Sequence, residues 1–490
     1  MKKTLSFYTL FFIFCTALMR LSGLLSKMIL AKSITPYEYG LITLIAISLP
    51  SMFQVLTNLF FNDLLSHSTK GSKYFGFTML YSAGISFILA ALVLIFHREF
   101  FSFMNVPLDD WRYLFLALFI VVIPSAFMVN MLGLLRGHRN YNLTSSVLAA
   151  PSILRVMLLG IAVYFFSVRD FNSILMLFAA PMLLVTVFVC VKEWRKLAKR
   201  MKDAASPPKD MMLFGLTIFI VGVYNGLTQS IAKVVISHDL GVEMQGYFDV
   251  SFSVLTLLAF SFTAMQFIAV PEATGRRDKK ELLYKKGELG DVLRALFALL
   301  IFCIIVLCFY SHSIIELLFS AAYTKAADYM YILALAHIFL FVQQALAYVN
   351  ISTGRDTREL RNMFIITVAA LLIFPFAAHY MILSTGFKGA YIASAAFLVL
   401  YSLATICFSR DRSPIKALLQ KGERLFVSSA AASALIFFLE PDMIPGIVLS
   451  GLVYVLLIFS SGYLHKDIVL DAFKTKKADD SGQDRSKPVI

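Results

Sequence analysis

Long runs of apolar residues constrain this chain more than any other feature of its sequence. Fourteen such runs can be marked, and each is long enough, or nearly so, to cross the ~30 Å hydrocarbon layer of a bilayer as a helix. They span about residues 4–30, 39–62, 74–96, 112–135, 144–166, 171–191, 211–236, 247–271, 291–310, 327–351, 362–382, 387–408, 425–440 and 445–464. A helix satisfies its own backbone polar groups where no water is present. The sequence therefore predicts an all-α polytopic membrane protein with about fourteen transmembrane helices.

The overall composition agrees with this class. Of the 490 residues, 59% are hydrophobic and 15% are charged, whereas soluble domains have roughly 45–50% apolar and about 25% charged residues. Lys2 and Lys3 before the first run resemble the start of a signal peptide, but no small-x-small cleavage site follows, so we interpret the run as an uncleaved first helix.

The distribution of positive charge predicts the topology. The net charge of +14 could suggest a nucleic-acid partner, but 33 loop cations lie on the side of the N-terminus and only six on the opposite side. By the positive-inside rule, both termini are expected in the cytoplasm of a multi-pass plasma-membrane protein, with no nucleic acid as partner.

Motifs for catalysis or cofactors are missing from the sequence. The five cysteines lie within or at the ends of apolar runs, so no disulfide framework is predicted, and no CxxC or HExxH spacing suggests a metal. No GxxxxGK[ST] stretch indicates ATP hydrolysis, and the loops are too short for a soluble catalytic domain. We therefore expect neither an enzyme nor a bound cofactor.

An internal repeat is visible at an offset of 206 residues, which places Lys27 on Lys233 and Gly40 on Gly246. Two six-helix bundles related by an axis along the membrane normal would follow. The predicted organisation is an N-terminal bundle (1–210), a C-terminal bundle that repeats it (211–410), two additional transmembrane helices (411–473) and a disordered cytoplasmic tail (474–490).

Four cations at membrane depth are the candidate substrate-binding residues. Arg20 and Lys27 are seven residues apart, which places both on one face of the first helix, and Arg155 lies near the middle of its segment. Charges at this depth cost at least ~2.5 kcal/mol on the insertion scale and usually face a protein interior or a watery cavity. For Lys27 and Lys233, which lie near the ends of their segments, snorkelling to the interface is the alternative.

For each of the other polar residues in the segments, both a functional and a purely structural role are possible. Asp249 is expected at the depth of Lys233 and could form an ion pair with it, and His337 could couple transport to protons or be a satisfied core histidine. Amides in segments 2, 7 and 10 could bind sugar hydroxyls or join helices to one another; the candidates are Asn58, Asn225, Gln229 and Gln343.

The whole chain resembles the polysaccharide flippases of the multidrug/oligosaccharidyl-lipid/polysaccharide exporter superfamily. The features that carry the resemblance are the two six-helix halves, the stretch Thr35-Pro36-Tyr37-Glu38-Tyr39-Gly40 between the first two segments, and Pro271-Glu272 followed by a basic stretch from Arg276. The resemblance implies a central cavity between two bundles that opens alternately to either side. It also implies that cations of the first helix, here Arg20 and Lys27, meet the diphosphate of the substrate.

The implied substrate is a polyprenyl-diphosphate-linked oligosaccharide, moved from the inner to the outer leaflet. The expected partners are this substrate, membrane lipids and polysaccharide assembly proteins, and the expected state is a monomer. The alternatives are a flippase for peptidoglycan precursors, a cation-coupled multidrug exporter of the same superfamily, and a membrane polysaccharide polymerase or ligase. A drug exporter needs acidic residues deep in the bundle, and a polymerase or ligase needs a sizeable outer loop.

Overall fold

The computed structural model describes residues 2–57, 74–106, 112–113, 117–137, 141–201, 226–258, 288–352, 357–409 and 413–464. Every regular element in these ranges is a helix. The first half contains α1 (Lys2–Ser33), α2 (Pro36–Thr43), η1 (Leu44–Ser48), α3 (Leu49–Thr57), α5 (Phe75–Ile95), α6 (His97–Phe103), η3 (Ala117–Val122), α8 (Ile123–Gly137), α9 (Tyr141–Gly160), η4 (Ile161–Phe165) and α10 (Phe171–Met201). Residues 226–240 form a further helix. After it come α12 (Val242–Leu255), α15 (Glu288–Leu318), η5 (Ala321–Ala326), α16 (Met330–Ser352), α17 (Thr357–Thr385), α18 (Phe387–Phe408), α19 (Ser413–Leu419), α20 (Gly422–Leu439) and α21 (Met443–Ser460).

Most of the predicted membrane segments are present as helices. Within the described ranges, nine helices are long and apolar enough to cross a bilayer, and two shorter apolar helices cover Leu118–Leu132 and Met330–Leu346. Together they match all the predicted segments except 39–62, 211–236 and 247–271, which the structure describes only in part. The all-helical, multi-pass class is confirmed, whereas the count of fourteen stays a prediction.

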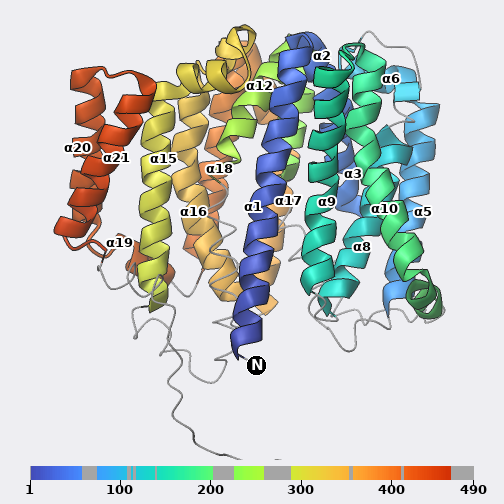
Figure 1. The fold of residues 1–490 in the computed structure, drawn as a ribbon, viewed down its shortest axis with the longest axis horizontal. Helices are drawn as coiled ribbons and strands as arrows, with labels where there is room; N and C mark the ends of the chain where they lie inside the picture. Colours follow the sequence, from blue (N-terminus) through green and yellow to red (C-terminus); the bar gives the residue numbers. More distant parts are fainter. Residues whose placement is uncertain are drawn as a thin grey trace, which may run out of the picture.

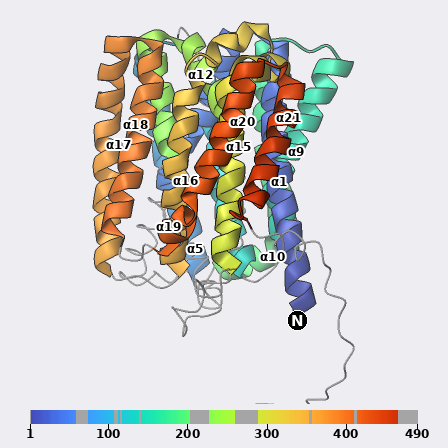
Figure 2. The ribbon, with the colours of Figure 1, turned by 90° about the vertical axis from the view of Figure 1, so that its left-hand side faces the viewer.

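The helices lie side by side and run along one common direction (Figure 1). On one side of α1, α9 packs against α10 and α1, and α8 packs against α5 and α10. On the other side, α16 packs between α15 and α18. Figure 2 shows that α17 pairs with α18 at one edge of the molecule. The pair α20–α21 packs against α15. This arrangement supports the division into two bundles and two additional helices, whose limits stay a prediction; the tail of residues 474–490 lies outside the described residues.

Prolines explain two interruptions of the α-helical pattern. The π-helical turns η1 and η3 each end two residues before a proline, at Pro50 and Pro124. A proline has no N–H for the carbonyl four residues earlier, and its ring pushes that carbonyl away, so the backbone widens there. The segment predicted at 39–62 is consequently divided, in its described part, into α2, η1 and α3.

The stretch between the predicted segments 291–310 and 327–351 is helical over much of its length rather than a loop. α15 continues through a kink at Tyr310 to Leu318, and the 3₁₀ turn η5 follows. The polar residues Ser311-His312-Ser313 interrupt the apolar run, which made the segment look as if it ended there. Ile315 and Phe319 follow four residues apart, as on one face of a helix, and both are fully buried. Burial of this face extends the helix beyond the apolar run marked at 291–310.

A capping box explains the sharp turn between α1 and α2. The backbone N–H of Glu38 donates to the Thr35 hydroxyl at 3.3 Å, and the Glu38 carboxylate accepts from the Thr35 N–H at 3.0 Å. Pro36 occupies the first helical position, where a missing N–H costs nothing. The sequence thus starts a new helix immediately, and this helix packs against α12.

Two glycines make the approach of α2 to α12 possible. A Cβ atom on Gly40 would lie 2.2 Å from the carbonyl oxygen of Val242, and one on Gly246 would lie 2.7 Å from that of Pro36. These are the glycines that the 206-residue offset matches, and the same offset matches the first residues of α2 and α12. The contact therefore supports the proposed repeat and identifies α2 and α12 as its joint.

Replacing Gly40 or Gly246 by alanine should weaken this joint. The added methyl group meets backbone atoms that cannot rotate away, and overpacking of this kind typically costs about 1–3 kcal/mol. Thermal unfolding of the purified variants should show a lower Tm than the wild type. Gly84→Ala, at a position with open space around it, is the matched control and should not lower the Tm. Equal Tm values for all three variants would contradict the tight contact.

Reporter fusions test the predicted topology. Reporter fusions after Lys202 and Lys477 should report the cytoplasm, and fusions after Asp239 and Lys325 should report the exterior, because basic loops are retained inside. A C-terminal reporter on the exterior would contradict both the orientation and the even number of crossings.

Candidate functional site

A carboxylate shared by two lysines lies between the two halves of the chain. Lys27 of α1 and Lys233 of the helix at 226–240 both form ion pairs with Asp249 of α12. The Lys27 Nζ is 2.8 Å from Oδ2, and Lys233 contacts Oδ1. Asp249 is fully buried, and the side chains of Lys27 and Lys233 are 16% and 6% exposed. Neither lysine extends its ammonium away to the surface, so the snorkelling alternative does not describe them here.

Two hydroxyl groups complete the surroundings of the carboxylate. The Tyr39 hydroxyl donates to Asp249 Oδ2 at 2.8 Å, and Lys27 Nζ also donates to the Ser253 hydroxyl at 2.8 Å. Charges this deep are tolerable only when they are paired and their remaining hydrogen-bonding capacity is used. We refer to Lys27, Tyr39, Lys233, Asp249 and Ser253 as the lysine–aspartate cluster.

Hydrogen bonds beside the cluster join pairs of positions that the 206-residue offset relates, but the charged residues are not repeated in the same way. The 206-residue offset carries Tyr39 to Gln245 and Thr43 to Asp249. Tyr39 bonds to Asp249, and Gln245 donates to the Thr43 hydroxyl at 3.3 Å, so equivalent positions contact each other across the joint. Only one of the two acceptors is an acid. Two cations therefore share one carboxylate, and the cluster carries a net positive charge.

An aromatic group covers the cluster at the end of the bundle where α2 lies, which we call the α2 end. Tyr323 of η5 is fully buried, with its ring centroid 5.5 Å from that of Tyr39 and 6.2 Å from that of Tyr247. Its hydroxyl lies 3.4 Å from the carbonyl oxygen of Ile34. The α2 end is therefore closed by contacts between α1, α2, α12 and η5.

The two arginines predicted for the cavity differ in their surroundings. Arg155 is half-buried on α9, donates from Nε to the Phe178 carbonyl at 2.8 Å, and lies over the Phe178 ring at 4.2 Å. Arg20 is half-buried on α1, about 10 Å along the helix from Lys27 by the rise of an α-helix.

The other candidate residues are separate from the cluster or outside the described ranges. Gln229 and His337 line a void of about 30 Å³, which is too small for a sugar. The His337 ring bonds through Nδ1 to the Leu333 carbonyl at 2.7 Å, and Gln343 is fully buried. A sugar contact by Gln229 or Gln343 would therefore need another conformation. Asn58 and Asn225 lie outside the described residues.

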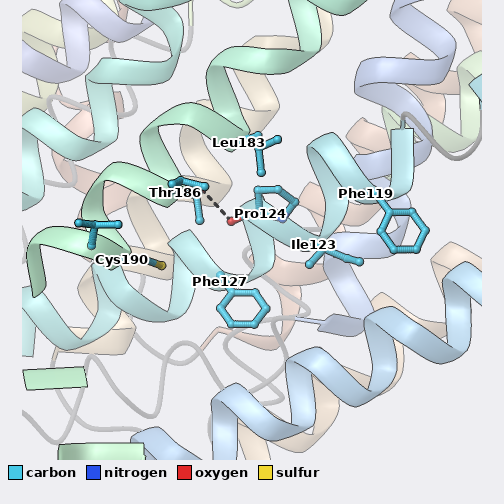
Figure 3. Close-up of a pocket in the computed structure, with 9 residues that line it drawn as sticks. Phe119, Ile123, Pro124, Phe127, Leu183, Thr186 and Cys190 are labelled. Carbon is cyan, nitrogen blue, oxygen red and sulfur yellow. Dashed lines mark hydrogen bonds between the residues drawn. The ribbon is translucent and has the colours of Figure 1, made fainter. Parts of the chain in front are cut away.

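A larger groove, of about 590 Å³, lies between η3–α8 and α10 (Figure 3). Its lining is apolar except for the Thr186 hydroxyl and the Cys190 thiol, and Thr186 donates to the Pro124 carbonyl at 3.1 Å. Because no charged side chain lines it, this groove does not fit an anionic headgroup.

Comparison with known proteins gives the family. Residues 29–328 match the family described as "Polysaccharide biosynthesis protein". The chain belongs to this polysaccharide biosynthesis protein family. The match includes Arg155, Lys233 and Asp249 and begins two residues after Lys27. Among curated proteins, none matches this family member by sequence.

Solved structures identify the fold of this polysaccharide biosynthesis protein. It is similar to the lipid II flippase MurJ in an inward closed conformation, with a TM-score of 0.66, 15% identity, and coverage of 94% of this chain and 99% of MurJ. It is also similar to an inward-facing multidrug resistance MATE transporter of the MOP superfamily (TM-score 0.55, 13% identity, coverage 82% and 96%). A mutant of the Vibrio cholerae MATE transporter VcmN follows (TM-score 0.52, 11% identity, coverage 87% and 98%). The polysaccharide biosynthesis protein thus has the fold that MurJ and the MATE transporters share.

Proposed function

We propose that this transporter flips a polyprenyl-diphosphate-linked oligosaccharide from the inner to the outer leaflet by alternating access. The observation that carries the proposal is the lysine–aspartate cluster. Two lysines share one carboxylate at the contact between the halves, so one positive charge is left over and can pair with an additional anion. A diphosphate supplies such an anion wherever water is excluded. The family description, which concerns polysaccharide biosynthesis, agrees with a glycan-carrying substrate.

Entry takes place from the side opposite the α2 end. The positive-inside rule assigns that side to the cytoplasm, and the contacts of α2, α12 and η5 close the other. Arg20 and Arg155 then meet the headgroup first. Guanidinium groups bind phosphate with paired, charge-assisted hydrogen bonds, which suits the initial capture of a diphosphate.

Exit requires the cluster to come apart. Lys27 and Tyr39 belong to the first half and Asp249 to the second, so an opening between α2 and α12 separates them. Leaving a buried charge unpaired costs about 3–5 kcal/mol. A phosphate that replaces Asp249 as the partner of Lys27 lowers this cost, and substrate arrival thereby favours opening. After release, Asp249 binds Lys27 again and closes the α2 end.

A flippase for peptidoglycan precursors is the second candidate, favoured by the structural similarity to MurJ. It would use the same cluster, since the relevant chemistry is an anionic headgroup at membrane depth. A cationic drug fits less well, because the one acid of the cluster already binds two lysines. We further propose that the transporter is a monomer that works beside polysaccharide assembly proteins, with both termini in the cytoplasm.

The test is transport by the purified protein in vesicles. Fluorescent polyprenyl-diphosphate lipids that carry either an oligosaccharide or a peptidoglycan precursor should be offered in parallel with a cationic dye. We expect movement of the oligosaccharide lipid and none of the dye. Movement of the peptidoglycan precursor alone would select the second candidate, and movement of the dye alone would contradict an anionic substrate.

Export should depend on the charge of the side chain that replaces Lys27. Lys27→Gln removes one attraction for the headgroup but leaves Lys233 and Asp249 paired, so reduced export is expected. Lys27→Glu places a second carboxylate beside Asp249 and adds repulsion, so export should be lower still. Surface-glycan export in a strain deleted for the gene, with protein levels checked by blot, measures both. Equal export by the two variants would contradict an electrostatic role of this position.

A further inference from the structure

We propose that His238, Asp239 and His379 form a binding site for a divalent transition metal of the zinc class at the α2 end of the second half. The three side chains offer one donor atom each, and these atoms all lie within 4.8 Å of one another. Asp239 Oδ1 is 2.6 Å from His238 Nδ1 and 2.8 Å from His379 Nδ1. The inference does not depend on the identity of the transported substrate.

The carboxylate at the centre of the group is buried, and the two imidazoles on either side of it are partly exposed. The Asp239 side chain is 2% exposed, whereas those of His238 and His379 are 41% and 47% exposed. The buried carboxylate is thus held in place between two imidazoles that are each only half covered by the protein. The ring of His238 also packs against Phe103, with centroids 5.0 Å apart, which limits its rotation.

The set of donors is specific for the metal class. Two imidazoles and a carboxylate are ligands that Zn²⁺ takes with distances of about 2.0–2.2 Å, whereas Mg²⁺ and Ca²⁺ prefer oxygen alone. Donors on a tetrahedral ion of this size are about 3.3 Å apart. The carboxylate-to-imidazole separations of 2.6–2.9 Å are those of hydrogen bonds, so each of these pairs needs to move apart by only about half an ångström. The two imidazole nitrogens lie within 4.8 Å of each other, so a modest rotation of the rings would bring both onto one ion. A water molecule would complete the coordination.

The position of the site gives the metal a structural effect. His238 and Asp239 lie at the end of the helix that carries Lys233, and His379 lies on α17, 140 residues further along the chain. A metal bound to all three would tie these two helices together. It would therefore raise the stability of the second half and restrain the helix that bears Lys233.

Another histidine–carboxylate pair offers a matched control. His312 Nε2 lies 3.1 Å from Asp328 Oδ1, with side chains 62% and 43% exposed. Among the described residues, this pair does not belong to a group of three metal-binding donors. It has the same chemistry without the third ligand or the burial.

The experiment is metal titration of the full chain, purified in detergent without a histidine tag and stripped with a chelator. Zn²⁺ binding by calorimetry, the visible spectrum of added Co²⁺, and the Tm with and without Zn²⁺ are the measurements. The wild type and His312→Gln should bind one ion tightly, with a tetrahedral Co²⁺ spectrum and a higher Tm. Asp239→Asn and His379→Gln should each bind at least about tenfold to hundredfold more weakly, the loss typical of removing only an outer-shell partner of a ligand, and should lose the rise in Tm.

Each alternative result overturns the proposal. The proposal is contradicted if the wild type does not bind Zn²⁺ saturably, if bound Co²⁺ gives an octahedral spectrum, or if the wild type and the two ligand variants bind equally. The Tm without metal shows whether a variant is folded, and His238→Gln provides a third ligand variant on the exposed side if Asp239→Asn is unstable.

Discussion

Asp249→Asn is expected to destabilise the protein more than removal of either lysine that binds it. The change leaves Lys27 and Lys233 in a buried position with no acid between them. Removing one partner of a buried ion pair typically costs about 3–5 kcal/mol, and here two cations lose their partner at once. Lys233→Gln, in contrast, leaves one cation and one carboxylate, which can still pair.

Thermal unfolding of the purified variants measures this order. The Tm should fall in the sequence wild type, Lys233→Gln, Asp249→Asn. Asp328→Asn removes a carboxylate from an exposed pair and should change the stability by no more than about 1 kcal/mol. If Lys233→Gln lowers the Tm more than Asp249→Asn does, the acid is not the centre of the cluster.

Asp249→Asn and Tyr39→Phe should also differ from each other in a defined way. Tyr39→Phe removes one hydrogen bond to the carboxylate and leaves both ion pairs. The free energy of unfolding should therefore fall by no more than about 1.5–3 kcal/mol. Export should persist in Tyr39→Phe and be lost in Asp249→Asn. Loss of export in both, with normal protein levels, would show that the hydroxyl itself takes part in transport.

Arg20→Ala is expected to leave only a small fraction of surface-glycan export while the protein level and membrane insertion stay normal. The side chain lies on the same face of α1 as Lys27, where the proposed headgroup enters. A lost charge-assisted contact of about 1.5–3 kcal/mol corresponds to roughly a tenfold to hundredfold lower rate. Arg20→Lys should restore only part of the activity, because an ammonium group cannot bind phosphate with paired donors.

Arg155 needs a different comparison. Its guanidinium also holds α10 through the Phe178 carbonyl and ring, so Arg155→Ala removes a structural contact together with a charge. Arg155→Gln keeps a donor for that carbonyl and is the better test of the charge. Export in a deletion strain, with each variant's level checked by blot, is the measurement. Full export by the Arg20→Ala, Arg155→Ala double variant would contradict the proposed capture of an anion by arginines.

Much of the fold followed from local properties of the chain. In lipid the backbone must pair within its own segment, so the length of an apolar run is enough to predict a helix there. The turn before α2 was equally local, since the capping box and Pro36 lie within a few residues of each other. The common face of Arg20 and Lys27, and the repeat that matches Gly40 with Gly246, could also be read from spacing alone.

The site itself was decided by tertiary packing. Matching depth predicted the pair of Lys233 with Asp249, which the structure contains. Hydropathy does not show how a segment is rotated, so it could not show that Lys27 shares the same carboxylate across 222 residues of chain. The role of Tyr39 as a third donor to that carboxylate has no local signal. The group of His238, Asp239 and His379 was missed for the same reason, because short metal motifs require ligands near each other in sequence. Apolar length and hydrogen bonding within a segment determined the helices of this protein; the rotation and approach of those helices, set by packing at Gly40 and Gly246, decided which charges meet.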